Sequence, residues 1–200
     1  MLTVLDLEFN QAYDFGDDSS TAEPNPKCRF EIIQIGAVKV DDHFKVQDKF
    51  NIYIKPTLYP RIHPYVEKIT GFKTEDFSFS PRFKEAYSKF RYFLGNDIVL
   101  GTWGYSDIKA LFRNITFNDI MEPPIIINYV DIQKIATKYL KYNRGGAIGL
   151  KNAVDALNIT IDENKHFHNA LGDAYYTAKV LETINPKELP IRIFNSKHIK

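Results

Sequence analysis

The hydrophobic and polar positions of this chain follow two periods, one typical of strands and one typical of helices. Leu2–Glu8 is a short apolar run, which predicts a buried central strand. Phe30–Val40 is rich in isoleucine and valine, and after a turn at Asp41 the residues of Phe44–Ile54 alternate as a partner strand. Two further short strands are predicted at Ile98–Leu100 and Ile125–Asn128.

Apolar residues at helical spacing predict helices between and after these strands. Pro81–Leu94 shows such a face, and Ser80 is suited to cap this helix with proline at its first position. Asp131 is suited to cap a helix over Ile132–Lys141. Other helices are expected at Tyr65–Thr70, Tyr105–Asn114, Leu150–Leu157 and Asn169–Ile184, the last with a stripe of Ala170, Ala174, Ala178 and Leu181.

The order of these elements predicts an α/β fold. Three strands joined by short links begin as an antiparallel meander, and the later strands alternate with helices and are expected to run parallel to the first. We expect a mixed five-stranded sheet flanked by helices, formed by one domain over residues 1–185 and followed by a basic tail over residues 186–200. Residues 10–27 interrupt this pattern as an acidic loop with two prolines, which we interpret as a solvated insertion, a functional loop being the alternative.

Composition narrows the function classes. A net charge of +1 gives no overall basic field, so any contact with nucleic acid must be local or bridged by metal ions. A single cysteine, Cys28, excludes an internal disulfide and a zinc site with several cysteines. The chain has no apolar run of the roughly 18 residues that a membrane span needs, and its first residues lack a signal-peptide pattern. We therefore expect a cytoplasmic protein without a membrane partner.

Asp6 and Glu8 are two positions apart on the predicted first strand, so both side chains point to one face while Leu5 and Leu7 point to the other. Adjacent carboxylates repel each other unless a cation lies between them, and an unpaired buried carboxylate is costly. This pair predicts a metal site, the alternative being a solvent-facing pair on an edge strand. Asp107 follows the strand at Ile98–Leu100 and lies in the first turn of the next predicted helix. Taken alone, an aspartate in this place favours stabilisation of the helix N-terminus over a metal site.

Three segments together resemble the motifs of the DEDDh branch of DnaQ-like 3′→5′ exonucleases: Leu5–Phe9, Trp103–Asp107 and His168–Asp173. The resemblance extends from Leu2 to about Ile184. The histidine motif of that family has four residues between His and Asp, which His168 and Asp173 match and His166 does not. The likeness is greatest to Eri-type and KapD-like members, through Phe30–Val38, Ile69–Phe72 and Gly149–Ala153.

The resemblance implies an RNase H-like fold and hydrolysis assisted by two Mg²⁺ or Mn²⁺ ions, which prefer hard oxygen ligands. By the same resemblance, Asp6 contacts both ions, Glu8 and Asp173 complete the one that activates water, and Asp107 holds the other. His168 is then the general base, since histidine has an unperturbed pKa of about 6.5.

The implied substrate is the 3′ end of single-stranded RNA or DNA, with RNA expected and nucleoside 5′-monophosphates as products. Phe9, Phe72 and Trp103 are candidates to stack on bases, with core packing as the alternative for each, and His166 is expected at the surface or in a supporting position. Three other functions remain open: a DNA repair or proofreading exonuclease, a non-catalytic RNA-binding or regulatory module on the same fold, and a non-enzymatic domain whose acidic residues are all at the surface.

Overall fold

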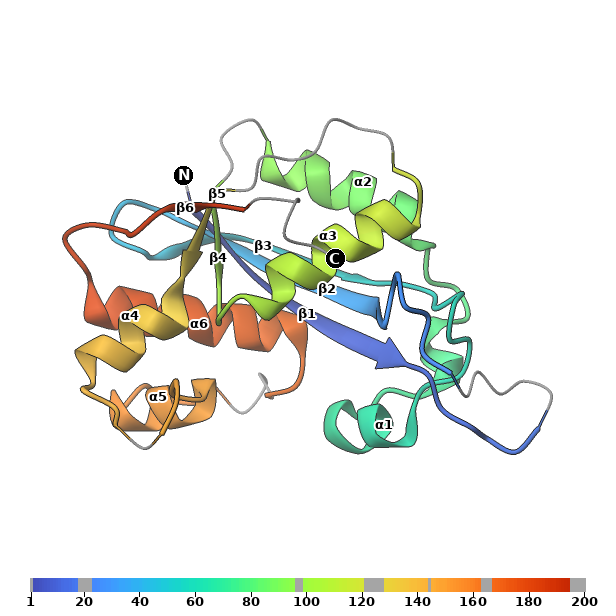
Figure 1. The fold of residues 1–200 in the computed structure, drawn as a ribbon. Coiled ribbons are helices and arrows are strands. Elements are labelled where there is room, and N and C mark those ends of the chain that lie inside the picture. The colour runs from blue at the N-terminus through green and yellow to red at the C-terminus, as the bar shows by residue number, and fades with distance from the viewer. Residues whose placement is uncertain are drawn as a thin grey trace.

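A computed structural model describes residues 2–17, 23–95, 99–120, 128–143, 145–162 and 167–194, and shows one open sheet with helices on both faces (Figure 1). The strands are β1 Leu2–Gln11, β2 Phe30–Val40, β3 Val46–Tyr53, β4 Val99–Thr102, β5 Asn128–Asp131 and β6 Arg192–Ile193. The helices are α1 Pro64–Thr70, the 3₁₀ turn η1 Thr74–Phe77, α2 Phe83–Leu94, α3 Ser106–Phe117, α4 Ile132–Tyr139, α5 Leu150–Ala156 and α6 Ala170–Ile184.

The sheet has the strand order β3-β2-β1-β4-β5-β6, which places β1 inside it. β1 pairs antiparallel with β2, whereas β1 with β4 and β4 with β5 pair in parallel, as the alternation of strands and helices predicts. The described sheet has six strands where five were expected, because Arg192–Ile193 in the C-terminal segment pairs antiparallel with β5. Two exposed residues carry no alternating pattern, and so the sequence gives no signal for this strand.

The two faces of β1 enter different parts of the core. Leu5 and Leu7 pack with the apolar faces of α2 and α3, whereas Leu2 and Val4 pack with residues of α6 on the opposite face. This is the division that strict alternation along a strand predicts, and it sends Asp6 and Glu8 toward the α6 side. The predicted stripe of α6 is fully buried, at Ala170, Ala174, Ala178 and Leu181.

Two helix starts test the capping predictions. Asp131 caps α4 as expected, since its Oδ1 accepts a hydrogen bond from the Lys134 backbone N–H at 3.0 Å. The prediction that Ser80 caps α2 is wrong, because the helix begins at Phe83 with Arg82 in the capping position. The Pro81 carbonyl instead accepts a hydrogen bond from Lys55 N–H at 2.9 Å, which keeps this segment beside the chain that leaves β3.

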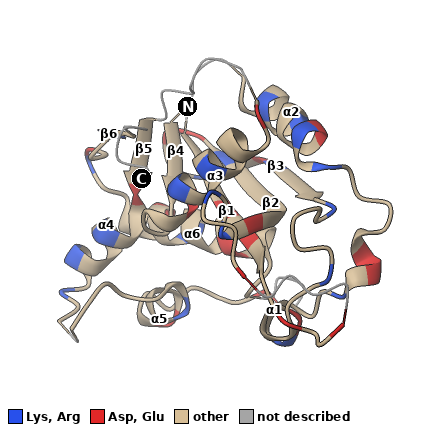
Figure 2. Ribbon diagram, turned by 45° about the vertical axis from the view of Figure 1, so that its right-hand side comes forward, with Lys and Arg blue, Asp and Glu red and all other residues tan. Residues whose placement is uncertain are grey.

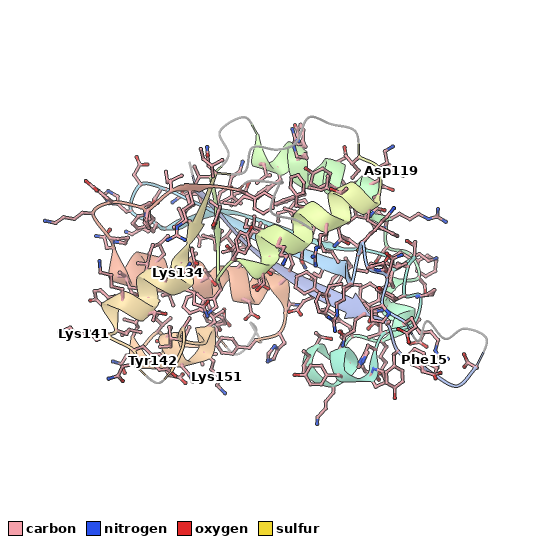
Figure 3. The ribbon with its side chains drawn as sticks, viewed as in Figure 1. Phe15, Asp119, Lys134, Lys141, Tyr142 and Lys151 are labelled. Atoms are coloured by element: carbon pink, nitrogen blue, oxygen red, sulfur yellow. The ribbon has the colours of Figure 1, made fainter. Side chains whose placement is uncertain are left out.

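The buried side chain of Asn10, near the end of β1, holds the segment that leads into α1. Asn10 is fully buried, donates to the Tyr59 and Arg61 carbonyls at 2.8 Å each, and accepts from His63 N–H at 2.9 Å. Phe15, labelled in Figure 3, lies under the Arg61 guanidinium, whose central carbon is 3.8 Å from the ring centroid. The described part of the acidic loop is therefore packed onto the segment that leads into α1.

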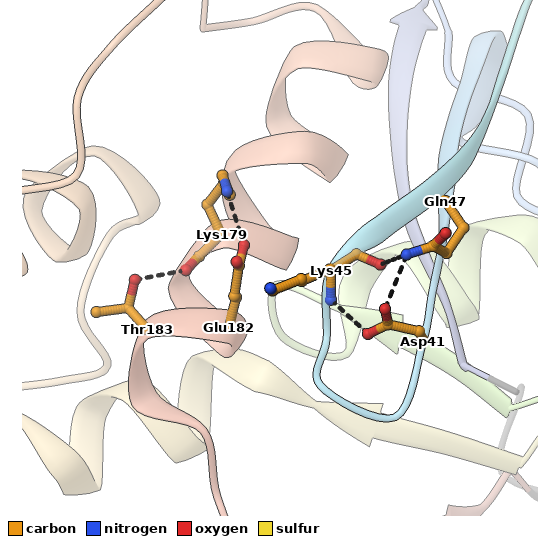
Figure 4. A network of polar contacts seen from close by, with 6 residues as sticks. All are labelled: Asp41, Lys45, Gln47, Lys179, Glu182 and Thr183. Carbon is orange, nitrogen blue, oxygen red and sulfur yellow. Dashed lines mark hydrogen bonds and ion pairs between the residues drawn. The ribbon is translucent and has the colours of Figure 1, made fainter.

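The turn that joins β2 to β3 lies close to α6 (Figure 4). Asp41 accepts hydrogen bonds from Lys45 N–H at 2.9 Å and from Gln47 Nε2 at 2.8 Å, which closes the predicted turn. On α6, Lys179 pairs with Glu182 at 2.7 Å.

Among the helices that the structure describes, none has the length and apolar character needed to cross a membrane.

Candidate active site

Three carboxylates meet on the face of β1 that looks toward α6. Asp6 and Glu8 come from β1 and Asp173 from the first turn of α6, and each offers an oxygen within 4.8 Å of the others. Asp107 lies buried in the first turn of α3, outside that close group but near enough for its charge to act on Asp6 and Glu8. The structure thus brings all four predicted carboxylates to one region from three elements.

The ionisation of these carboxylates is strongly disfavoured when no cation is present. Burial, followed by the neighbouring negative charges, raises the pKa of Asp6 well above its ordinary value and the pKa of Glu8 to about 8. Burial likewise raises the pKa of Asp107 to about 7. It raises the pKa of Asp173 to about 6, where the backbone N–H and the charge of His168 partly oppose it. A cation among these groups would offset both burial and mutual repulsion.

A buried oxygen without a partner supports the same interpretation. One oxygen of Asp173, Oδ2, accepts a hydrogen bond from the His168 N–H at 3.1 Å. Its other oxygen, Oδ1, is buried, and within the described part of the chain no hydrogen-bond donor reaches it. A buried oxygen without a hydrogen-bond partner lowers the stability of the fold unless a ligand binds it. Carboxylate oxygens are the ligands that Mg²⁺ and Mn²⁺ prefer, so these residues fit a divalent cation.

His168 stands exposed at the entrance to α6. Its backbone has φ of 62°, a left-handed conformation that is uncommon for residues other than glycine and asparagine. This conformation turns the chain so that the His168 N–H meets the carboxylate of Asp173 five positions later. His166 lies outside the described residues.

The start of α6 is held against the sheet by Gln34, which is fully buried in β2 beside Glu8. Gln34 Oε1 accepts a hydrogen bond from Ala170 N–H at 3.0 Å, and Gln34 Nε2 donates to Asn169 Oδ1 at 3.4 Å. Asn169 also caps the helix, because its Oδ1 accepts from Gly172 N–H. One side chain of the sheet therefore fixes the segment between His168 and Asp173.

Gly36 allows that close approach. It pairs with Asp6 in the sheet, and a β-carbon on it would lie 2.1 Å from the carbonyl carbon of Ala170. Neither Gln34 nor Gly36 is among the site residues predicted from the sequence. A glycine inside an otherwise β-branched strand is a signal of close backbone approach that could have identified Gly36. No comparable signal marks Gln34, because its partner is 136 positions away.

The three aromatic candidates occupy different surroundings. Phe9 is half-buried, with its ring centroid 6.2 Å from that of Phe30. Phe72 packs on Phe77 at a centroid distance of 5.8 Å, in a small cluster beside α1. Trp103 is half-buried, and its indole N–H donates to the Ile148 carbonyl at 3.2 Å. Each ring has packing partners, and a stacking role for any of them stays a prediction.

Comparison with known proteins gives matches to an exonuclease family and to a DNA polymerase subunit. A family model described as exonuclease (RNase_T) matches residues 4–181. The epsilon subunit of DNA polymerase III from Buchnera aphidicola subsp. Schizaphis graminum is 29% identical over 161 residues, which cover 78% of this chain. The chain spans only 65% of the length of that relative.

Two solved structures show the same fold. The nuclease domain of 3′hExo, a DEDDh family member bound to rAMP, superposes with a TM-score of 0.76 at 18% identity, covering 97% of this chain and 96% of that one. Exonuclease I of E. coli in complex with a dT13 oligonucleotide gives a TM-score of 0.65 at 16% identity, covering 92% of this chain and 40% of that one. Because the family model covers most of the sequence, the chain belongs to the exonuclease (RNase_T) family.

Proposed function

We propose that this chain is a 3′→5′ exonuclease that hydrolyses single-stranded nucleic acid to nucleoside 5′-monophosphates. The observation that carries the proposal is the partly buried group of Asp6, Glu8 and Asp173, each of which offers an oxygen within 4.8 Å of the others, beside an exposed histidine. Structural ion pairs do not explain this group, because each of these carboxylates has a raised pKa rather than a lowered one.

In this proposal two divalent cations, Mg²⁺ or Mn²⁺, are held by Asp6, Glu8, Asp107 and Asp173. When bound, such ions neutralise the scissile phosphate and stabilise the charge that develops on the leaving oxygen. Asp6 lies on β1 between β2 and β4, and it is proposed to contact both cations. Glu8 and Asp173 serve the cation on the nucleophile side, and Asp107, which comes from α3, serves the other.

His168 is proposed as the general base that accepts a proton from the attacking water. Its side chain is exposed, so it can reach a water molecule at the edge of the carboxylate group. Its backbone is tied to Asp173, so the imidazole starts from a position next to a proposed metal ligand. A base in this place contributes roughly two to four orders of magnitude to the rate.

RNA is proposed as the preferred substrate. The support is the match to a DEDDh nuclease bound to rAMP, which covers 96% of that chain, whereas the match to exonuclease I covers 40% of its chain. Proteins distinguish RNA from DNA by contacts to the 2′-hydroxyl. A DNA repair or proofreading exonuclease is the alternative, favoured by the likeness to the epsilon subunit of DNA polymerase III.

The test is incubation of the purified chain with 5′-labelled single-stranded RNA and DNA of the same sequence, with Mg²⁺ or with Mn²⁺. The proposal predicts progressive shortening from the 3′ end, with RNA cut at least as fast as DNA. A strong preference for DNA across several sequences would favour the repair alternative. Binding of RNA without hydrolysis under any metal condition would favour a non-catalytic RNA-binding module.

A further inference from the structure

A cavity of about 420 Å³ opens between α3 and the neighbouring ends of β1 and β2. None of the four carboxylates lines it, but the residues next to Glu8 and Asp107 do. Its lining combines two aromatic rings and two cationic side chains with small residues. The lining residues are Phe9, Phe30, Ser106, Lys109, Ala110 and Arg113.

Two walls of the cavity are continuous in sequence with proposed metal ligands. Phe9 directly follows Glu8, and the register of β1 against β2 shifts between these two residues, which marks a bulge. Ser106 directly precedes Asp107 at the start of α3. Two proposed metal ligands therefore each adjoin a wall of the cavity along the chain.

The cavity carries local positive charge. Lys109 and Arg113 are four positions apart on α3, so their side chains extend from the same side of the helix. Both side chains are half-buried and line the cavity. Figure 2 shows basic positions on α3 in front of the strands that carry the acidic ones. Because the whole chain has a net charge of only +1, phosphate binding depends on such local pairs.

An exposed aromatic ring completes the lining. Phe30 is 40% exposed although it begins a buried strand, and its ring centroid is 6.2 Å from that of Phe9. The Arg29 guanidinium carbon lies 5.8 Å from the Phe30 ring centroid. Exposed rings beside cations are the combination by which proteins bind single strands without reading sequence.

We propose that this cavity binds the part of a single-stranded substrate that lies on the 5′ side of the scissile phosphate. Lys109 and Arg113 contact backbone phosphates, and Phe30 stacks on a base. This inference rests on the proposed exonuclease function and adds to it the path of the substrate. The chemistry favours a nucleic acid, because a single strand supplies regularly spaced phosphates for the two cations and a base that can stack on the exposed ring.

The test compares two substrates in each variant. One is a single strand of roughly twelve nucleotides, within the range of site sizes for one binding groove. The other is a dinucleotide without a 5′ phosphate, which offers no further backbone phosphate on the 5′ side of its scissile bond. Lys109→Gln combined with Arg113→Gln should lower kcat/KM for the long strand at least tenfold more than for the dinucleotide. Phe30→Leu should show the same selective loss, roughly fivefold or more. Lys138→Gln on α4 removes an exposed lysine elsewhere and should change neither substrate.

Salt dependence gives a second readout, measured as binding of the long strand in an Asp6→Asn background that does not cut. The slope of log Kd against log salt should fall by about 0.7 for each phosphate contact removed. Arg113→Lys keeps the charge and should retain most of the wild-type slope. If Arg113→Gln fails to fold, Lys109→Gln alone should still show half of the change.

Two results would overturn the inference. Suppose that the wild type cuts the dinucleotide. If the variants then lose activity equally on both substrates, or on neither, the cavity is not part of the substrate path and the proposed function still stands. A wild type that cuts neither substrate would overturn both the function and the path. A selective loss on the long strand with a reduced salt slope is the supporting result.

Discussion

Gly36 and Ala170 touch through their backbones: a β-carbon placed on Gly36 would lie 2.1 Å from the Ala170 carbonyl carbon. Gly36 pairs with Asp6 across the sheet, and Ala170 begins the helix that carries Asp173. The distance between carboxylates that come from distant parts of the sequence is therefore set by a contact that only glycine permits.

Gly36→Ala should lower both activity and stability. The added methyl group must push the start of α6 away from β2, which moves Asp173 relative to Asp6, and a displacement of about 1 Å in a catalytic arrangement can cost on the order of 100-fold in rate. Steady-state turnover and thermal unfolding measure the two effects. Gly146→Ala is the matched control, because a β-carbon there would meet nothing within 4 Å. Wild-type turnover in Gly36→Ala would contradict this account of the contact.

Asp6→Asn should remove nearly all turnover and leave the fold intact. The pKa of Asp6 is raised by burial and by neighbouring carboxylates, so the neutral amide relieves repulsion in the metal-free protein. We expect its melting temperature at pH 8 without metal to equal or exceed that of the wild type, by about 2–4 °C for each kcal/mol relieved. The stabilisation of the wild type by Mg²⁺ or Mn²⁺ should be largely lost. Wild-type rates in Asp6→Asn would refute the site assignment.

The metal-free protein should lose stability as pH rises. Burial raises the pKa of Glu8 from its ordinary value of 4.5 to about 8, so between these two values the folded state holds a proton that the unfolded state has released. The stabilisation tied to that proton is complete below about pH 4.5 and is lost as pH rises through about 8. Thermal unfolding in chelator should show this decline.

Two comparisons isolate the cause of that decline. Adding Mg²⁺ or Mn²⁺ should raise the melting temperature more at pH 8 than at pH 5.5, because the ions bind the ionised carboxylates of the folded state. Glu8→Gln should flatten the pH dependence of the metal-free protein. If the wild type and Glu8→Gln decline in parallel, the carboxylate group is not the source.

His168→Ala should lower turnover by roughly two to four orders of magnitude, the range for a lost general base. The logarithm of the wild-type rate should rise with pH and then level off, because the neutral imidazole is the active form. Metal-induced stabilisation should change little, since the carboxylates hold the cations. His166→Ala is the control and should be mild. Equal losses at both histidines would contradict the assignment, and a large loss at His166 alone would identify the other histidine as the base.

Periodicity was sufficient to predict the elements with strong patterns. Alternation along Leu2–Glu8 placed Asp6 and Glu8 on one face, and the structure confirms that Leu5 and Leu7 face the opposite side. The bounds of the second strand, Phe30–Val40, agree with the prediction at both ends. In such segments a local pattern and the tertiary core require the same arrangement.

The remainder depended on contacts that a local pattern does not record. Ser80 has the chemistry of a helix cap, but the Pro81 carbonyl is occupied by Lys55 N–H, and the helix starts later. The resemblance to a family brought the three carboxylate motifs together, because the spacing alone leaves Asp107 open to a role in its own helix. The residues that hold those motifs in place, Gln34 and Gly36, act through a helix more than a hundred positions away.

The proposed activity is exonucleolytic attack at a free 3′ end by a metal-dependent carboxylate site. The most direct measurement follows one 5′-labelled single strand in two forms, with a free 3′-hydroxyl and with a blocked 3′ end, in Mg²⁺ or Mn²⁺. We expect a ladder of 3′-shortened products and nucleoside 5′-monophosphates from the free strand, and protection of the blocked strand. Both products should be lost in chelator or in Asp6→Asn. Equal degradation of the free and blocked strands, or degradation that persists in chelator, would contradict it.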